Sequence, residues 1–389
     1  MSARHWRLTQ TPYNKNQLKG TIIVVLGILI AALIASAQSP APDSSVNSEA
    51  NVAKELQSYF DSLAAENKLS GVLLVAKDGV TVASKAGGIA NKATNAPIDL
   101  NTKFNLGSMN KMFTSVAIAQ LAQAGKLSFT DTIGKHLPDY PNKEVADKVT
   151  IHQLLTHTSG LGMYWNEKFM AQREKLLTVA AHIPLFASDP LLFPPGEKFQ
   201  YSNSGFMVLG AIIEKVSGQD YYGYVQEHIY KPAGMSNTGF YEPGKETPNL
   251  AIGYSRMSPD GKPLEEAKDN TNTREVKGGP AGGGYSTAPD LVKFQQALLS
   301  YRLLDKERTD LITTGKVDGP GGRGRYGYGF GENTSGGKRS VGHNGGAPGI
   351  AANFEMFPES SYTAIQLMNS DPPTMMPIAK AIRERIPAK

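Results

Sequence analysis

The sequence contains no cysteine among its 389 residues. This absence excludes disulfide bonds, a thiol nucleophile and every metal site that depends on thiolate ligands. The sequence also lacks the His-Glu-x-x-His pattern of zinc peptidases and the Gly-x-Ser-x-Gly turn of the α/β-hydrolases. His152 and His157 are five residues apart, so a helix would not place them together as metal ligands. We therefore expect neither a metal nor a cofactor.

Acidic residues are absent from the first 37 positions, where Arg4, Arg7, Lys15 and Lys19 carry four charges of the net +5. The remaining residues hold 36 basic and 35 acidic side chains, so their net charge is close to zero. Binding to nucleic acid depends on an excess of basic side chains. The composition therefore gives no reason to expect a nucleic-acid partner.

A short apolar run, Thr21–Ala35, follows these basic residues and leads into Ala35-Ser-Ala37, which has the small-x-small form of a signal-peptidase site. The run is shorter than the roughly 20 residues that span a bilayer. We predict that residues 1–37 are a cleaved signal peptide and that the protein is exported, either periplasmic or secreted. The long basic region leaves an uncleaved N-terminal anchor as the alternative, and membrane contact is expected only in that case. Residues 38–50, rich in proline and serine, are interpreted as a tether.

Apolar periodicity divides the remaining residues, 51–389, into strands at both ends and helices in the middle. The polar stretch 244–277 is predicted to form surface loops. The predicted fold class is α/β (α+β): an antiparallel sheet flanked by helices, built from about 51–105 and 280–389, with an all-helical part of about 106–279 inserted. Strands are predicted at 71–76, 80–84, 326–330, 339–342, 350–357 and 362–368, and helices at 52–63, 108–125, 150–155, 168–182, 203–216, 219–229, 290–304 and 378–386.

Ser108 and Lys111 stand at the start of the predicted helix that follows Gly107, and their spacing of three puts both side chains on one face of its first turn. A hydroxyl beside an amine at the positive end of a helix dipole is suited to nucleophilic catalysis. Ser-x-x-Lys is nevertheless common, and Ser335-Gly-Gly-Lys338 repeats it in a glycine-rich stretch that we interpret as a hairpin tip. Alone, Ser108 is explained equally well as a helix cap.

Tyr201 and Asn203 form a second candidate segment, directly after a Phe-Pro-Pro-Gly-Glu run. A phenol near an amine could relay protons, and the amide could orient the lysine and a substrate carbonyl. The alternative is a loop tyrosine followed by a helix-capping asparagine. The pattern is common, since Tyr140-Pro-Asn142 repeats it in what we interpret as a surface turn.

His343, Gly345 and Gly346 form a third candidate segment, before the strand predicted at 350–357. Glycines here let another backbone approach closely. A free N–H at this edge could complete an oxyanion hole with the N–H of Ser108. His343 could donate to a substrate carboxylate or tune the proton network, but taken alone it is better explained as a strand-end histidine.

Together, the order and spacing of Ser-x-x-Lys, Tyr-x-Asn and His-x-Gly resemble those of the penicillin-recognising serine hydrolases. This family includes class C β-lactamases, D,D-carboxypeptidases, D-aminopeptidases and related esterases, and the resemblance implies a β-lactamase/transpeptidase-like fold. It extends over residues 52–389. It is reinforced by Leu154-Leu-Thr-His-Thr-Ser-Gly-Leu161, the Phe-Pro-Pro-Gly-Glu run, Lys231-Pro-Ala-Gly-Met235 and Gly282-Gly-Gly-Tyr-Ser-Thr287.

The resemblance implies a role for each residue of the first two motifs. Ser108 is similar to the acylated nucleophile and Lys111 to its neutral amine partner. Tyr201 matches the tyrosine that shares the work of the general base, and Asn203 matches the amide that orients the substrate. The sequence does not decide whether Lys111 or Tyr201 takes the proton.

For the third motif the resemblance implies substrate binding by His343, Gly345 and Gly346, with the backbone of Gly346 as the second oxyanion donor. His343 occupies the place often held by lysine in β-lactamases, which makes efficient β-lactamase action less expected. His157 and Ser159 belong to a family signature, and we interpret both as structural.

The implied function is that of an exported serine hydrolase that forms an acyl-enzyme with a small amide or ester. A D-amino-acid-containing peptide, such as a peptidoglycan fragment, is the favoured substrate, and a carboxylesterase of the same fold is the alternative. A non-catalytic binding relative is the alternative from another class, although a binding protein has no need for the complete residue set. Tyr164 and Trp165 either line a pocket or pack on the surface.

Overall fold

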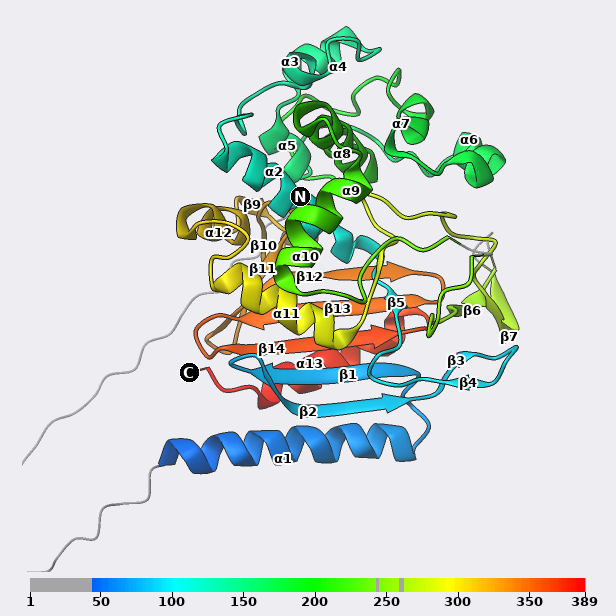
Figure 1. The fold of residues 1–389 in the computed structure, drawn as a ribbon, viewed down its shortest axis with the longest axis vertical. Coiled ribbons are helices and arrows are strands. Elements are labelled where there is room, and N and C mark those ends of the chain that lie inside the picture. The colour runs from blue at the N-terminus through cyan, green and yellow to red at the C-terminus, as the bar shows by residue number, and fades with distance from the viewer. Residues whose placement is uncertain (1–43, 243–244, 259–261, 389) are drawn as a thin grey trace, which may run out of the picture. The chain divides into compact units, whose positions relative to one another are not determined.

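An eight-stranded antiparallel sheet lies at the centre of the computed structural model (Figure 1). Its strand order is β2-β1-β14-β13-β12-β11-β10-β9. Strands from the two ends of the chain are neighbours, as predicted, because β1 pairs with β14 along its whole length. The strands are β1 (Gly71–Lys77), β2 (Val80–Gly87), β9 (Val317–Asp318), β10 (Arg325–Tyr326), β11 (Gly331–Ser335), β12 (Lys338–Ala347), β13 (Ile350–Phe357) and β14 (Tyr362–Met368).

The structure describes residues 44–242, 245–258 and 262–388. The predicted signal peptide, 1–37, and the start of the predicted tether lie outside these ranges. The first described element, α1 (Ser44–Ala65), includes residues 44–50, so the backbone of this part of the expected tether is helical. Within the described ranges no helix combines the length and hydropathy that a bilayer crossing requires.

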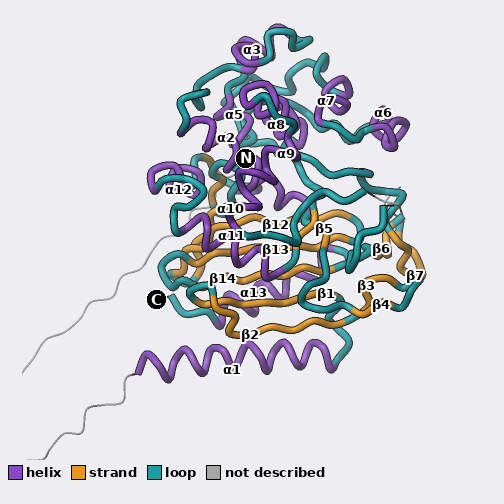
Figure 2. The backbone as a smooth tube through the Cα atoms, viewed as in Figure 1, coloured by secondary structure: helices purple, strands orange, loops and turns teal. Residues whose placement is uncertain are grey.

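Helices cover both faces of the sheet (Figure 2). α1 and α13 (Met375–Arg385) pack on one face, and α2 (Asn110–Gln123) and α11 (Ala288–Leu299) pack on the other. Because side chains alternate along a strand, Val72 and Leu74 of β1 enter one core while Leu73 and Val75 enter the other. Burial on both faces explains why this strand is an uninterrupted apolar run.

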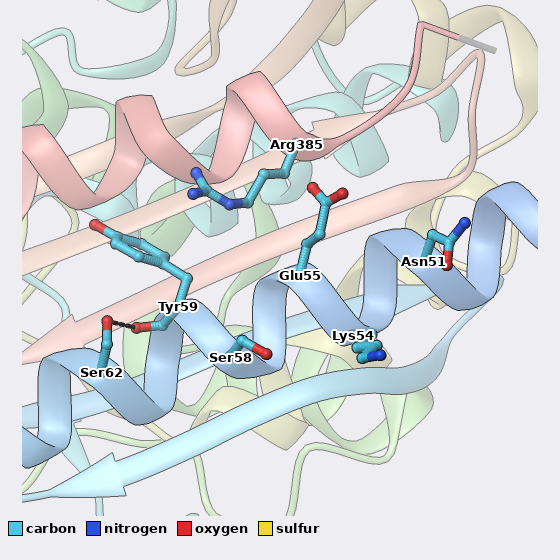
Figure 3. A pocket seen from close by; sticks show the side chains of 7 residues that line it. All are labelled: Asn51, Lys54, Glu55, Ser58, Tyr59, Ser62 and Arg385. Atoms are coloured by element: carbon cyan, nitrogen blue, oxygen red, sulfur yellow. Dashed lines mark hydrogen bonds between the residues drawn. The ribbon is translucent and has the colours of Figure 1, made fainter.

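A polar groove runs between α1 and α13, on the face of the sheet that these two helices cover (Figure 3). The guanidinium of Arg385 lies 4.7 Å from the ring centroid of Tyr59, and Ser62 Oγ donates to the Tyr59 carbonyl oxygen over 2.8 Å. Because α2 packs on the opposite face of the sheet, this groove is separate from Ser108. Its lining residues are Asn51, Lys54, Glu55, Ser58, Tyr59, Ser62 and Arg385.

A short pair of strands marks both the start and the end of the helical insertion. β5 (Phe104–Asn105) pairs with β8 (Tyr285–Ser286), so the chain leaves the sheet and returns at the same place. The helices between them are α2, α3 (Ile133–His136), α4 (Lys143–Lys148), α5 (Ile151–Leu155), α6 (Glu167–Gln172), α7 (Val179–His182), α8 (Asn203–Ser217), α9 (Tyr221–Val225) and α10 (Lys231–Ala233). After β8 come α11 and α12 (Lys306–Thr313).

Local end signals placed several elements correctly. Thr150 caps α5 through a capping box with Gln153. Gly218 ends α8 in the left-handed conformation, with φ of 74°. The glycine-rich Ser335–Lys338 segment is the tight turn between β11 and β12, as predicted.

Three predicted elements are wrong or shortened. The stretch 244–277 contains a hairpin, β6 (Tyr254–Met257) with β7 (Pro263–Asp269), whose strands are mostly exposed and therefore lack an apolar pattern. The helix predicted at 168–182 is broken, because Thr178 caps a new helix, α7. The strand predicted at 326–330 stops at Tyr326, since a turn follows in which Gly327 N–H donates to the Phe330 carbonyl over 2.7 Å.

A further small pair joins β3 (Ile89–Asn91) to β4 (Ala96–Pro97).

Candidate active site

Ser108 lies in a 3-10 turn, Gly107–Met109, that leads directly into α2. Gly107 has φ of +50°, in the left-handed region, and a Cβ there would lie 3.1 Å from both Gly345 Cα and Gly346 N. Only glycine satisfies both demands easily. The turn presses against β12, which brings the first and third motifs into contact.

Lys111 is fully buried beneath this turn. Its Nζ lies 3.4 Å from Ser108 Oγ and donates to Asn203 Oδ1 over 2.7 Å and to the Ala281 carbonyl oxygen over 2.5 Å. Burial lowers the pKa of Lys111 to about 7, and the negative charge of Glu275 opposes that shift. A large fraction of Lys111 is therefore a neutral amine near neutral pH.

The partners of Lys111 determine where its lone pair points. Carbonyl oxygens only accept hydrogen bonds, so Asn203 Oδ1 and Ala281 O take the two N–H groups of a neutral amine. Of the three atoms around Nζ, only Ser108 Oγ carries a proton that the lone pair can receive. The arrangement is therefore that of an amine base facing a hydroxyl.

Tyr201 and Asn203 reach the site from the start of α8. The side chain of Ser202 caps the helix by accepting from Gly205 N–H over 3.1 Å, which fixes its two neighbours. The phenol of Tyr201 lies beside the side chain of Ser108, and Lys111 Nζ lies 4.8 Å from the Tyr201 ring centroid. Burial raises the pKa of Tyr201, so this side chain stays a neutral phenol at ordinary pH.

The edge of β12 supplies a backbone donor. The two-residue turn between β11 and β12 makes the even-numbered residues of β12 bond toward β11. β11 ends opposite Gly342. Beyond Gly342, no described strand pairs with the edge of β12 that faces β11. The N–H of Gly346 consequently points toward the Ser108 turn, while a Cβ at Gly345 would lie 1.9 Å from the Leu106 carbonyl oxygen. The N–H groups of Ser108 and Gly346 thus lie on either side of one position, where both could donate to the same oxygen atom.

His343 lies one layer behind this edge and already uses both ring nitrogens. Nδ1 donates to the Asn344 carbonyl oxygen over 2.5 Å, and Nε2 is 2.9 Å from Tyr326 Oη. Burial lowers the pKa of His343 to about 3, so the ring is neutral. The possibility that His343 donates to a substrate carboxylate does not fit this geometry, because the neutral ring has no N–H left to donate.

A directional chain of hydrogen bonds connects His343 with His157. Ser202 N–H donates to His157 Nδ1 over 3.1 Å, which leaves the proton of this ring on Nε2. His157 Nε2 lies 3.2 Å from Tyr326 Oη, so Tyr326 accepts here and donates to His343. The ring of His157 also packs against that of Tyr201, with centroids 4.2 Å apart and planes tilted by 34°. His157 is therefore a buried residue with a structural role, as interpreted from the sequence, and its contacts extend to Tyr201.

The Tyr326→Phe variant is expected to lose about 2–4 kcal/mol of unfolding free energy, because it leaves His157 and His343 each with an unpaired buried ring nitrogen. Tyr328→Phe is a matched control from the same turn, since Tyr328 Oη has one histidine partner, His152 Nδ1 at 2.8 Å. Chemical denaturation of both variants measures the difference. Equal losses for the two variants would show that the hydrogen bonds linking His157, Tyr326 and His343 contribute no more to the unfolding free energy than the single bond of Tyr328.

The structure therefore gathers the predicted residues of the three motifs, with Ser108, Lys111, Tyr201 and Asn203 in direct contact. The second copies of the Tyr-x-Asn and Ser-x-x-Lys motifs lie elsewhere. Asn142 caps α4, and Ser335 is in the exposed β11–β12 turn. Two residues of the surroundings, Tyr326 and Glu275, were not identified from the sequence, because no local pattern marks them. His157 was identified by its place in the Leu154–Leu161 segment.

The comparisons with known proteins agree with this geometry. The Beta-lactamase family model matches residues 56–388. Penicillin-binding protein 4* of Bacillus subtilis is 29% identical over 338 residues, which cover 83% of this chain and 73% of that protein. Esterase EstB of Burkholderia gladioli is 30% identical over 318 residues, covering 72% of this chain and 79% of the esterase.

A solved structure shows the same arrangement of the chain. The crystal structure of a D-stereospecific amidohydrolase from Streptomyces sp. superimposes with a TM-score of 0.65 at 25% identity, covering 83% of this chain and 94% of that one. The fold predicted from the sequence is thereby confirmed. Because the family model spans nearly all described residues, the chain belongs to the Beta-lactamase family of serine hydrolases.

Proposed function

We propose that this chain is a serine hydrolase in which Ser108 is acylated by a small amide or ester and Lys111 is the general base. One observation carries the proposal: Lys111 Nζ is buried, uses two N–H groups on carbonyl oxygens and faces Ser108 Oγ. A neutral phenol at Tyr201 is a weaker base than a largely neutral amine. We therefore assign the first proton transfer to Lys111 and a relay role to Tyr201.

The reaction follows from these positions. Ser108 Oγ attacks the substrate carbonyl carbon while its proton moves to Lys111 Nζ, and a tetrahedral adduct forms. The N–H groups of Ser108 and Gly346 stabilise the oxyanion, each donor being worth roughly 3–4 kcal/mol in comparable sites. The leaving group takes the proton back through Lys111 or Tyr201 as the carbon–leaving-group bond breaks. Water, activated by the same groups, then cleaves the ester to Ser108.

The favoured substrate is a derivative of a D-amino acid, such as a D-amino-acid amide or peptide. Support comes from the similarity to the Streptomyces D-stereospecific amidohydrolase, and from the predicted export of the chain, which would bring it near peptidoglycan. A carboxylesterase remains the second candidate because of the similarity to esterase EstB. Neither nucleic acid nor a cofactor enters this proposal.

Covalent labelling tests the proposal directly. The purified protein is treated with a fluorophosphonate or, separately, with benzylpenicillin, and the peptides are analysed by mass spectrometry. We expect one adduct, on the peptide that contains Ser108. Rates on a D-Ala-D-Ala peptide, a D-amino-acid amide, a short-chain p-nitrophenyl ester and nitrocefin then rank the substrate classes, with nitrocefin slowest. An adduct on another residue, or no adduct with either reagent, would refute the assignment of Ser108.

A further inference from the structure

Glu275 is a buried carboxylate that the proposed reaction does not use. Its side chain is 7% exposed, in the segment between β7 and β8. Tyr164 Oη donates a short hydrogen bond to Glu275 Oε1, and Trp165 Nε1 donates to the same oxygen over 3.3 Å. The second oxygen, Oε2, accepts no hydrogen bond from a described residue and is not among the fully buried unpartnered atoms. One oxygen of the carboxylate is therefore open.

The open oxygen lies close to the nucleophile. A Cβ at Gly283 would be 3.2 Å from Glu275 Oε2, and Gly283 N–H donates to the carbonyl oxygen of Gly107 over 3.1 Å. Gly107 is the residue before Ser108. A single backbone segment, at Gly283, therefore contacts both Glu275 Oε2 and the Ser108 turn.

Two basic side chains, His182 and Lys111, lie near Glu275 but are not hydrogen-bonded to it. Burial raises the pKa of Glu275, and His182 and Lys111 oppose that shift. Lys111 Nζ makes its three contacts with Ser108, Asn203 and Ala281. His182 Nδ1 donates to the Thr178 carbonyl oxygen over 2.8 Å, and its Nε2 has no partner among the described residues. Burying a carboxylate costs free energy that a bonded cation would offset. No residue within 44–242, 245–258 or 262–388 supplies such a bonded cation at Oε2.

Exposed apolar side chains border the same place. Met163 is 41% exposed, and its Sδ accepts from Asn203 N–H over 3.4 Å. Trp165 is 45% exposed although its indole N–H is fixed on Glu275, and its ring stacks on Phe169 with centroids 5.8 Å apart. An apolar surface therefore adjoins both the carboxylate and the substrate-orienting amide. Of the two aromatic residues considered from the sequence, Tyr164 is buried, whereas Trp165 is exposed at the surface with its indole N–H bonded to Glu275.

We propose that Glu275 Oε2 binds the ammonium group of the substrate, while an apolar substrate side chain lies on Met163 and Trp165. The substrate class is amides and esters of hydrophobic amino acids with a free α-amino group. The indole ring adds a favourable face for the cation. This inference rests on the proposed function and narrows it, because a substrate with a carboxylate at this place would be repelled by Glu275. The proposal therefore favours an aminopeptidase or amino-acid amidase, whose substrates carry a free α-amino group, over a carboxypeptidase.

The test compares phenylalanine p-nitroanilide, as separate D and L enantiomers, with the N-acetylated forms at pH 7, where an α-amino group is mostly protonated. The measured quantity is the ratio of kcat/KM for the free amine to kcat/KM for the N-acetyl compound. We expect the wild-type ratio to exceed about 10 for at least one enantiomer, and to fall about 10- to 100-fold in Glu275→Gln. Glutamine keeps an acceptor for Tyr164 and removes only the charge.

The matched control is Glu174→Gln, which removes the charge of a carboxylate whose side chain is 85% exposed; it should leave the ratio unchanged. A ratio near one in the wild type overturns the inference without any variant, and so does a ratio that Glu275→Gln does not change. Hydrolysis of p-nitrophenyl acetate is measured in parallel. If the wild type fails to cleave that ester and forms no adduct at Ser108, the proposed function itself fails, independently of Glu275.

Discussion

Replacing Ser108 by alanine is expected to lower kcat/KM for a p-nitrophenyl ester by about 10⁴- to 10⁶-fold, because the acyl-enzyme can no longer form. The residual rate above that of water would come from substrate binding and the two backbone donors. Ser108 Oγ contacts Lys111 and Tyr201 and is only partly buried, so the stability of the fold should change by about 1 kcal/mol or less. Steady-state kinetics and thermal denaturation measure the two effects.

Ser335→Ala is the matched control for this loss. Ser335 has the same Ser-x-x-Lys spacing but is exposed at the β11–β12 turn, so its removal should leave kcat/KM unchanged. A Ser108→Ala protein that retains activity within tenfold of the wild type would place the nucleophile elsewhere. A wild-type protein that binds substrates without turning them over would instead favour the non-catalytic relative.

The three segments of the candidate site were predictable because each carries its own local signal. Gly107 and the helix after it mark the Ser108 turn, and the apolar pattern of 203–216 places Asn203 at a helix start. The glycines that precede the strand predicted at 350–357 indicate the sheet edge that holds Gly346. The convergence of these segments was not visible in any one pattern and came from the family resemblance, which the family match now confirms.

The surroundings of the site could not be predicted in the same way. Glu275 lies in a polar, glycine-rich stretch whose composition is that of a surface loop, yet packing with Tyr164 and Trp165 buries it. Tyr326 is positioned by a turn, and its two histidine partners lie 169 and 17 residues away in sequence. Pairings over such separations follow from the tertiary fold, which local propensity does not encode.

The second large effect is expected at Lys111, and it should appear as a change in the pH dependence as well as in the rate. Only the neutral amine can take the proton of Ser108, and burial lowers the pKa of Lys111 to about 7. Wild-type kcat/KM should therefore rise as pH increases from 5 to 8, level off above about pH 8, and fall about tenfold per unit well below pH 7. Lys111→Met should lower the plateau by about 10²- to 10⁴-fold and abolish this inflection.

Three further proteins separate the role of Lys111 as a base from its role in packing. Lys111→Arg keeps a positive charge that cannot be lost at accessible pH, so it should be inactive across the whole range. Lys126→Met changes an exposed lysine just beyond α2 and should behave as the wild type. Because the serine and its base act as one unit, Ser108→Ala combined with Lys111→Met should be scarcely slower than Ser108→Ala alone. An inflection near pH 7 that survives in Lys111→Met would transfer the role of base to another group, and a flat wild-type profile would show that Lys111 is neutral throughout.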